Sequence, residues 1–395
     1  MFQYARRFDS IPPYLFGEIA RLKAKAISEG KDLIDFGIGD PDQPTPKIII
    51  DKLAEAAADP RTHGYDESDY GWPDFINAAS EWFDRRFGVQ LDPAKGELLQ
   101  VIGSKEALAH IAWAFIDPGD IALVPDPGYP VYKVHTAMAG GTPYIMPLLG
   151  ENGFLPDLKA IPEDVAQKAK LMYLNYPNNP TGAIATMEFF EEVVAFAKKY
   201  NIIVVHDAAY SEVSYDGYKA PSFLEVPGAM DVAIEMHSLS KTYNMTGWRI
   251  GFAAGNAEIV KGLDKMKSNV DSKQFPAVSS AAAYALRNLD GNPETFALYE
   301  KRRDILIDGL NSLGWKLPKP KATLYVWIPV PPGYSSKEFS MMMLEEASVN
   351  VIPGNGYGQY GEGYARFSLT VNGDKNGERV AEAVDRMRKN LDIKW

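Results

Sequence analysis

Ser238-Leu-Ser-Lys-Thr-Tyr-Asn-Met-Thr-Gly-Trp-Arg249 is the stretch from which the rest of the chain can be interpreted. It follows the apolar run at residues 232–236 and leads into residues 251–255, a second short strand-like segment. Lys241 is therefore expected in a loop rich in small residues and hydroxyl groups, between two buried strands. Partial burial lowers the pKa of a lysine, so that its amine becomes a nucleophile toward carbonyl groups.

The same stretch contains groups that suit a phosphate. The hydroxyls of Ser238 and Ser240 and the guanidinium of Arg249 can all donate to an anion. A nucleophilic amine beside a phosphate site matches pyridoxal phosphate (PLP), which carries both an aldehyde and a phosphate. A lone Ser-x-x-Lys is more often part of a solvated loop, so the hypothesis depends on the segments described next.

Composition limits the possible classes of protein. The 395 residues exceed what one small core needs, so we expect a large and a small domain. The net charge of −11 argues against general nucleic-acid binding, and the absence of cysteine excludes disulfides and thiolate chemistry. The N-terminus does not resemble a signal peptide, and no apolar run approaches the roughly 20 residues of a membrane span. We therefore expect a cytoplasmic protein with neither membrane nor nucleic-acid partners.

Two further motifs are weighed and set aside. Residues 356–361 fit the spacing of a dinucleotide-binding fingerprint, but they lead into a strand rather than opening a helix. A nicotinamide site is therefore not expected. The five histidines show no spacing typical of metal ligands, so no metal site is expected either.

Helix-like and strand-like segments alternate from about residue 47. Short unbroken apolar runs joined by amphipathic helices indicate a mainly parallel sheet covered on both faces. In such sheets ligands bind beyond the carboxyl ends of the strands. Shorter elements after residue 275 predict a second, α+β domain. The strand-like runs are residues 98–102, 121–124, 143–148, 171–174 and 202–207, and the helix-like runs are 17–28, 48–58, 74–87, 104–116 and 187–200.

Polar residues stand at several of these strand ends. Asp207 ends an apolar strand, and a buried carboxylate there needs a partner, for which the pyridine nitrogen of PLP is suitable. Tyr210 and Asn179 could each donate a hydrogen bond to the phenolic oxygen of the ring. The alternatives are that Asp207 caps a helix and that Asn179 only shapes the turn Asn-Pro-Thr-Gly182.

Four more residues extend the pattern. Ser104 and Lys105 open a helix after a strand and a glycine, where backbone N–H groups and the helix dipole favour an anion. Ser104 is also a good N-cap. Tyr129 could stack on a ring or simply belong to the core. Arg366, in the middle of a predicted strand, is either exposed or a bidentate clamp for a carboxylate.

These residues occur along the chain in an order and spacing that resemble the class I/II aminotransferases of PLP fold type I. The motifs Asn179-Pro-Thr-Gly, Asp207-Ala-Ala-Tyr and Ser238-Leu-Ser-Lys-x7-Arg carry the resemblance, which covers nearly the whole chain. It implies a large PLP-binding domain at residues 46–285, with a mainly parallel, mixed seven-stranded sheet between helices. A smaller α+β domain at 286–395 and an N-terminal arm at 1–45, partly joined to the small domain, complete the expected fold.

The resemblance also implies roles for individual residues. Lys241 would bind the PLP aldehyde covalently and move the proton of the substrate α-carbon, while Asp207 would pair with the pyridinium. Asn179 and Tyr210 would contact the phenolic oxygen. Tyr65 would reach the phosphate of the neighbouring subunit, which implies a homodimer. The expected phosphate ligands are Ser104, Lys105, Ser238 and Arg249, with Tyr129 on the ring, and the expected substrate contacts are Tyr14, Gly39, Lys105, Tyr129, Asn179 and Arg366.

Within that family the chain is most similar to the aminotransferases that act on LL-diaminopimelate. The similarity lies in Pro-Pro-Tyr14-Leu-Phe-Gly-Glu-Ile, in Gly37-Ile-Gly-Asp-Pro and in Gly103-Ser-Lys-Glu-Ala-Leu. Such a long substrate needs an anchor at its far end, for which Glu67 or Asp69 of a partner subunit are further candidates. The stretch at residues 65–71 departs from the usual family spacing by one residue.

The sequence therefore predicts a homodimeric PLP aminotransferase that moves an amino group from LL-diaminopimelate to 2-oxoglutarate in lysine biosynthesis. Three alternatives stay open at this point. One is an aminotransferase for alanine, aspartate, methionine or aromatic amino acids. Another is a PLP lyase or synthase on the same scaffold. The third is a PLP-binding regulatory module without catalytic activity.

Overall fold

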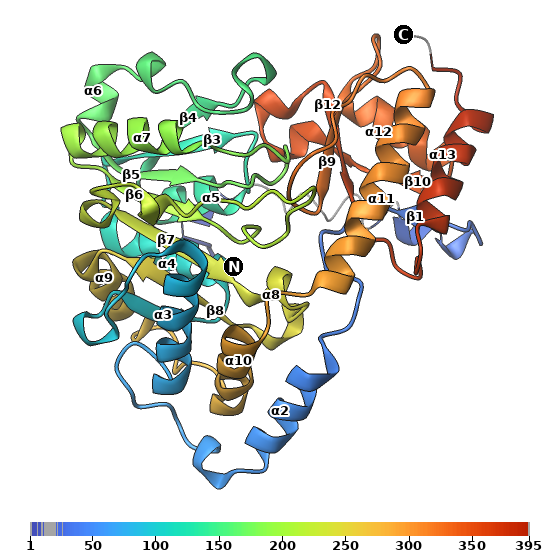
Figure 1. Ribbon diagram of the computed structural model, residues 1–395. Helices are drawn as coiled ribbons and strands as arrows, with labels where there is room; N and C mark the ends of the chain where they lie inside the picture. Colours follow the sequence, from blue (N-terminus) through green and yellow to red (C-terminus); the bar gives the residue numbers. More distant parts are fainter. Residues whose placement is uncertain are drawn as a thin grey trace.

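The computed structural model describes residues 2–5, 7, 8, 11, 21, 23–25 and 27–393. Its largest feature is a seven-stranded sheet in the order β2-β8-β7-β6-β5-β3-β4 (Figure 1). Strands β3 to β7 run parallel, whereas β8 is antiparallel to both of its neighbours. The predicted mixed, mainly parallel sheet is thus confirmed. The strands are β2 (Leu98–Val101), β3 (Ile121–Asp126), β4 (Thr142–Pro147), β5 (Ala169–Leu174), β6 (Ile203–Asp207), β7 (Ala233–Ser238) and β8 (Gly251–Gly255).

Both faces of this sheet are covered because alternate strand residues are buried in two different clusters. On β5, Met172 and Leu174 belong to one cluster and Leu171 and Tyr173 to the other. The first face packs against helices α3 (Pro73–Phe87), α7 (Met187–Tyr200) and α10 (Pro276–Asn288). The second face packs against α4 (Ser104–Phe115), α5 (Val131–Met138) and α9 (Ala257–Lys267).

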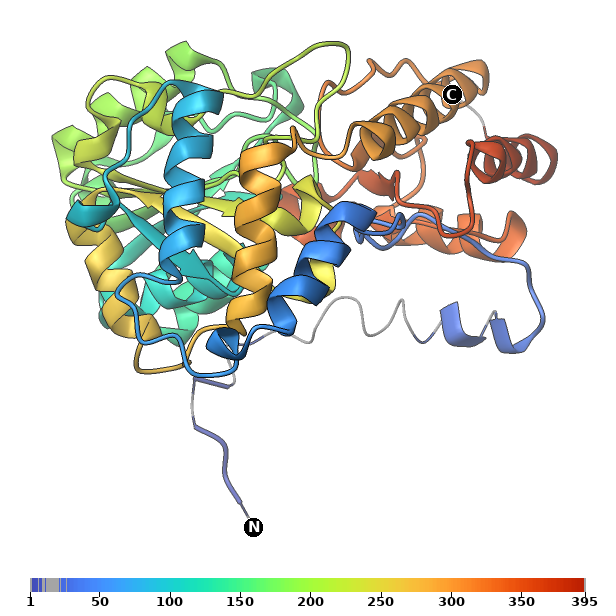
Figure 2. The ribbon, with the colours of Figure 1, turned by 60° about the horizontal axis from the view of Figure 1, so that its bottom comes forward.

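Local sequence explains where the covering helices begin and end. In α3, Phe75, Ala79 and Phe83 recur every four residues and form a buried stripe. The helix ends at Gly88, which takes the left-handed conformation with φ of 68°. In α7, the predicted N-cap Thr186 accepts from the Phe189 N–H at 3.3 Å. Figure 2 shows α3, α10 and α2 (Lys47–Ala57) side by side.

A separate hydrophobic cluster surrounds a three-stranded antiparallel sheet, with strand order β11-β12-β9. A short parallel pair of β1 and β10 joins the N-terminal part of the chain to this region. The elements here are β1 (Ile34–Asp35), β9 (Tyr325–Pro329), β10 (Val349–Asn350), β11 (Ile352–Pro353), β12 (Tyr364–Ser368), α11 (Pro293–Ser312), α12 (Ser336–Glu346) and α13 (Glu378–Asn390).

Residues 36–42, called the strap below, run from β1 along the edge of this second region toward α2. The Ser368 N–H donates to the Phe36 carbonyl at 2.8 Å, and the Thr370 hydroxyl donates to the Ile38 carbonyl. Arg302, fully buried in α11, holds both carboxylate oxygens of Asp42 at 3.0 and 2.8 Å. These contacts hold the strap against the second region, so that its middle residues face the large sheet.

Several local predictions need correction. Lys241 lies not in a loop but in the short helix α8 (Leu239–Thr242), because the Ser238 side chain accepts from the Ser240 N–H and starts a helical turn. Gly103, not Ser104, is the N-cap of α4, since its φ of 105° suits glycine. Helices α9 and α13 were not anticipated. Half of the predicted helix at residues 17–28 lies outside the described residues, and the described residues 21, 23–25, 27 and 28 are helical, as predicted. Among the described residues, no helix is long and apolar enough to cross a membrane.

Candidate active site

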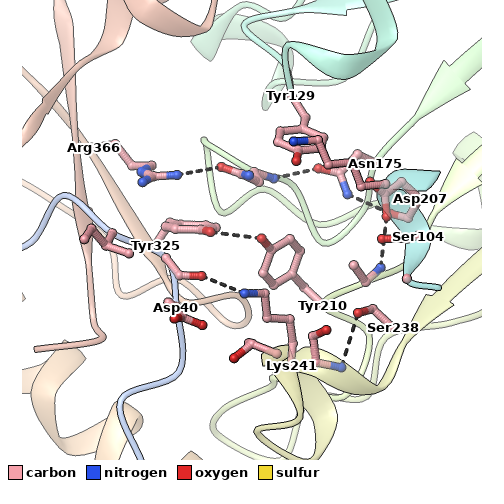
Figure 3. Close-up of a pocket in the computed structure, with 18 of the residues that line it drawn as sticks. Asp40, Ser104, Tyr129, Asn175, Asp207, Tyr210, Ser238, Lys241, Tyr325 and Arg366 are labelled. Carbon is pink, nitrogen blue, oxygen red and sulfur yellow. Dashed lines mark hydrogen bonds between the residues drawn. The ribbon is translucent and has the colours of Figure 1, made fainter. Parts of the chain in front are cut away.

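A cavity of about 500 Å³ opens where the carboxyl ends of β5, β6 and β7 face the strap and the three-stranded sheet. Figure 3 shows side chains from both sides directed into it. Of the predicted site residues that the structure describes, all lie in its lining except Tyr65, Glu67 and Asp69. The predicted residues in the lining are Gly39, Ser104, Lys105, Tyr129, Asn179, Asp207, Tyr210, Ser238, Lys241, Arg249 and Arg366.

Lys241 projects from α8 into the middle of the cavity, where its Nζ donates to the Gly39 carbonyl at 2.7 Å. Burial lowers the pKa of this amine to about 8, the nearby Asp40 carboxylate opposes the shift, and Arg366 and Arg249 reinforce it. The side chain is enclosed by protein but faces the cavity. An amine with this pKa is partly neutral near pH 7 to 8 and can attack an aldehyde.

Asp207 ends β6 and is buried, with 4% of its surface exposed. Its Oδ2 accepts from the Tyr132 hydroxyl at 2.8 Å, and its Oδ1 accepts from the Ala209 N–H at 3.3 Å. Burial raises the pKa of this carboxyl, and the hydrogen bond from Tyr132 partly offsets the rise. A buried carboxylate with one strong donor is well suited to receive a cationic N–H from a ligand in the cavity.

An anion-binding cradle lies at the N-terminus of α4. Backbone N–H groups in the first turn of a helix generally lack intrahelical acceptors, and the helix dipole is positive at that end. Arg249 lies against the glycine that precedes the helix, since a Cβ on Gly103 would come within 2.6 Å of the Arg249 Nη2. Ser104, Ser238 and Ser240 line the same side of the cavity. These donors suit a phosphate.

Two tyrosines meet across the cavity. The hydroxyls of Tyr210 and Tyr325 are 2.9 Å apart, and either can be the donor. Burial, with Tyr325 close by, raises the pKa of Tyr210 well above its usual value, so it remains a neutral hydroxyl. Tyr325 also approaches the strap closely, because a Cβ on Gly39 would meet its hydroxyl at 2.0 Å.

Arg366 lies in the middle of β12 with 2% of its surface exposed. Its Nη1 donates to the Asn179 Oδ1 at 3.1 Å and its Nη2 donates to the Gly37 carbonyl at 2.8 Å. The guanidinium stacks 4.1 Å above the Tyr325 ring. Its Nε is buried without a hydrogen-bond partner among the described residues. A buried guanidinium with spare donor capacity beside a cavity suits a carboxylate ligand.

Three predicted residues lie elsewhere. Tyr65 is 81% exposed and lines a different cavity, together with Glu67 and Asp69. Because Tyr65 does not line the cavity that contains Lys241, its role at the phosphate site of a partner subunit stays a prediction. Tyr14 is outside the described residues.

Sequence reasoning missed four residues that shape the cavity. Asn175 lines it, and its Nδ2 donates to the Asp207 carbonyl while its Oδ1 accepts from the Asn179 N–H. Asn175 directly follows β5 and Asp207 ends β6, so the strand-end rule could have found Asn175. Tyr132, Tyr325 and Asp40 have no comparable signal, because their relation to the cavity arises from tertiary contacts.

The arrangement can hold a small ring that carries an aldehyde, a basic ring nitrogen and a phosphate. Lys241 provides the nucleophile, Asp207 a partner for the nitrogen, and the cradle around Arg249 a partner for the phosphate. Arg366 remains available for the carboxylate of a second molecule.

The sequence and the fold identify the family. The family model for aminotransferase class I and II matches residues 31–386. The chain belongs to this family, and it is an enzyme that transfers amino groups, as the sequence predicted.

Individual relatives make this assignment more specific. The chain is 57% identical to the LL-diaminopimelate aminotransferase of Syntrophobacter fumaroxidans, covering 98% of this chain and 99% of the relative. It is 55% identical to that of Moorella thermoacetica, covering 98% of both. Among solved structures, substrate-bound BacF from Bacillus subtilis is similar, with a TM-score of 0.91 and 38% identity over 100% of this chain and 99% of that chain. The predicted similarity to LL-diaminopimelate aminotransferases is therefore confirmed.

Proposed function

We propose that this enzyme binds PLP in the cavity and transfers an amino group from LL-diaminopimelate to 2-oxoglutarate, in lysine biosynthesis. The substrate assignment is supported by the relatives that carry this activity in their names and match over nearly their full length. The observation that carries the cofactor assignment is one amine, Lys241, with its pKa lowered to about 8, between a buried carboxylate and an anion cradle.

The residues present fit the cofactor group by group. Asp207 would hold the ring nitrogen and keep it protonated, and Tyr210 and Asn179 would serve the phenolic oxygen. Ser104, Lys105, Ser238 and Arg249 would hold the phosphate, and Tyr129 would lie on the ring. When bound, PLP supplies an electron-withdrawing ring that stabilises negative charge at the substrate α-carbon.

Lys241 would hold the cofactor covalently and then, once released, carry a proton to and from the substrate α-carbon. A base works best when its pKa lies near the working pH, which the burial of Lys241 provides. Arg366 would clamp the α-carboxylate of the substrate and so orient the α-carbon toward Lys241, with Gly39 on the strap beside it. Holding the reacting groups in this orientation lowers the entropic cost of reaching the transition state.

The substrate assignment is tested by steady-state assays of the purified enzyme with LL-diaminopimelate, alanine, aspartate, methionine and aromatic amino acids, each with 2-oxoglutarate. We expect the highest kcat/KM for LL-diaminopimelate. A tenfold preference for any other donor would overturn the assignment while leaving the aminotransferase intact. Borohydride reduction and mass spectrometry should find the cofactor on Lys241, and a label on any other lysine would overturn the cofactor assignment.

We also propose that the active unit is a homodimer, in which Tyr65 reaches the phosphate site of the partner. Its 81% exposure and its separation from the cavity of its own chain support this role, as do the exposed rings of Phe2 and Tyr4 in the N-terminal arm. Glu67 and Asp69 near Tyr65, and Tyr14 in the arm, are the proposed anchors for the far end of the substrate.

Hybrid dimers test this shared site. Chains carrying Tyr65→Ala and chains carrying Lys241→Met are each expected to be inactive or weak alone. A hybrid of the two contains one site with both native residues, so coexpression should restore a substantial share of activity. If Tyr65 served its own chain, every site of the hybrid would lack one residue and no activity would return.

A further inference from the structure

A second cluster of titratable groups lies beneath the cavity, on the face of the sheet opposite Asp207. Its centre is Glu235 on β7, with 0% of its surface exposed. The carboxylate accepts from four donors: His206 Nδ1 at 2.8 Å, His237 Nε2 at 2.6 Å, Ser222 Oγ at 2.8 Å and the Phe223 N–H at 2.7 Å. Because a carboxylate has about four acceptor positions, Glu235 is fully satisfied. Burial alone would raise its pKa, but the hydrogen bonds from the two histidines hold the pKa well below its usual range.

Each of the two histidine partners of Glu235 leads to a residue of the cavity. His206 directly precedes Asp207 on β6, and His237 directly precedes Ser238 on β7. The other ring nitrogen of His206, Nε2, lies 3.0 Å from the carbonyl oxygen of Tyr176 and 3.3 Å from its N–H nitrogen. Tyr176 follows Asn175, the residue that holds the Asp207 carbonyl.

One carboxylate thus ties together the carboxyl ends of three adjacent parallel strands, β5, β6 and β7. The sheet register supports the link, because His206 pairs with Glu235 across β6 and β7. Asn175, Asp207 and Ser238 enter the cavity from these same three ends.

Aromatic side chains surround the cluster around Glu235 and exclude water from it. His237 stacks on Phe252 with ring centroids 4.9 Å apart, and Trp82 and Phe83 meet it edge-on. His206 meets the edge of Phe190 at 5.3 Å. In these surroundings a displaced imidazole would find no water to replace its lost bond, so the network has one stable arrangement.

We infer that Glu235 is a positioning residue for the aminotransferase reaction, acting through His206 and His237 on the strand ends that carry Asn175, Asp207 and Ser238. Glu235 does not line the cavity, so it would touch neither cofactor nor substrate. This role rests on the proposed binding of PLP in the cavity. It differs from a purely structural polar core, which would affect the stability of the fold but not the orientation of a bound cofactor.

The test is Glu235→Gln in the full-length protein, loaded with PLP. The glutamine amide keeps the shape of the side chain. Its N–H₂ group, however, replaces one of the two acceptor oxygens and therefore faces a hydrogen-bond donor. Two quantities are measured well below the unfolding temperature: the Kd for PLP, by titration of the apoenzyme, and the visible circular dichroism for each mole of bound PLP. We expect the Kd to weaken about tenfold, by analogy with the loss of outer partners in metal sites. The circular dichroism, which depends on the orientation of the cofactor, should change by at least about a third relative to wild type.

Two further variants keep the inference falsifiable if Glu235→Gln does not fold. His206→Asn places an amide N–H₂ near the position of Nδ1, so it retains the bond to Glu235 and loses the link to Tyr176. Ser222→Ala removes a different donor to Glu235 that leads to no cavity residue. His206→Asn should change both cofactor measurements, and Ser222→Ala should lower only the unfolding temperature.

The outcomes separate the two proposals. A wild-type protein that takes up no PLP would overturn the proposed cofactor. A wild-type protein that binds PLP normally, together with Glu235→Gln or His206→Asn variants that lose only thermal stability, would overturn the positioning role of Glu235 and leave the proposed function standing.

Discussion

The cavity has two walls that are built differently. The sheet wall consists of the strand ends and α8, with Asn175, Asp207 and Lys241, and neighbouring strands hold it in register. The strap wall consists of the strap, Tyr325 and Arg366. Its central contact, from Arg366 to the Gly37 carbonyl, joins residues 329 positions apart in the chain.

The difference in construction suggests a difference in role. The sheet wall contains the nucleophile, the buried carboxylate and the anion cradle, which are the groups that a permanently bound cofactor needs. The strap wall contains a stacked arginine with spare donor capacity, which suits a substrate that enters and leaves. Substitutions in the sheet wall should therefore reduce turnover with every donor, and those in the strap wall should reduce the productive binding of amino acids.

The largest effect is expected for Lys241→Met in the sheet wall. Without the amine there is no covalent attachment and no base for the α-proton, so kcat should fall by at least about 10⁴-fold. Steady-state kinetics and the loss of borohydride labelling measure this. Lys265→Met, at an exposed position of α9, is the matched control and should keep wild-type activity. If Lys241→Met retained a tenth or more of the activity, Lys241 would not be the nucleophile of the sheet wall, and the division of roles between the two walls would be wrong.

In the strap wall, Arg366→Lys should lower kcat/KM for amino-acid donors about 100-fold, because an ammonium cannot form the paired hydrogen bonds or the planar stack of a guanidinium. The Kd for PLP should stay within about twofold of wild type. Arg388→Lys, at a partly exposed ion pair on α13, is the control and should change neither quantity. An equal loss of cofactor binding in Arg366→Lys would show that the two walls do not act separately.

The capture of PLP by the apoenzyme should depend on pH through Lys241. The pKa is lowered to about 8 in the folded protein from 10.5, so the reactive neutral amine is lost as the pH falls below 8. The rate should drop about fiftyfold from pH 8 to pH 6, as the neutral fraction does. Over pH 8 to 10.5 the unfolded chain binds more protons than the folded one at this site, so the apoenzyme should also gain stability as the pH rises. Stopped-flow absorbance and chemical denaturation measure the two trends, and a rate independent of pH would contradict the assignment.

The contrast between the walls also explains what the sequence could predict. Lys241, Asp207 and Asn179 were found because strand ends and turn motifs are local signals, and parallel strand ends gather at one edge of a sheet. The α/β class and the mixed sheet followed from the same periodicity. Arg366 was recognisable in mid-strand, but its role as a carboxylate clamp followed only from the family resemblance, because the local pattern fits an exposed arginine as well as a buried one.

Other features could not be predicted because they depend on distant contacts. Tyr325 enters the cavity only because β9 pairs with β12 and the strap packs beside it. Tyr132 reaches Asp207 across 75 residues of sequence. The histidines at 206 and 237 were considered only as metal ligands, and their shared partner Glu235 comes from the register of two parallel strands.

The smallest effect is expected for Tyr325→Phe. This substitution tests the contact between the two walls, the hydrogen bond between Tyr325 and Tyr210. The phenylalanine ring keeps the stack under Arg366 and loses only the hydroxyl that bonds to Tyr210 at 2.9 Å. A neutral hydrogen bond contributes about 1 kcal/mol net, so kcat/KM should fall about fivefold. Tyr210→Phe removes the same bond and also the hydroxyl proposed for the cofactor, so its loss should be larger. The double variant should then be no worse than Tyr210→Phe alone, since the shared bond can be lost only once. If the two losses instead multiply, the hydroxyls act independently and the walls are not coupled through this pair.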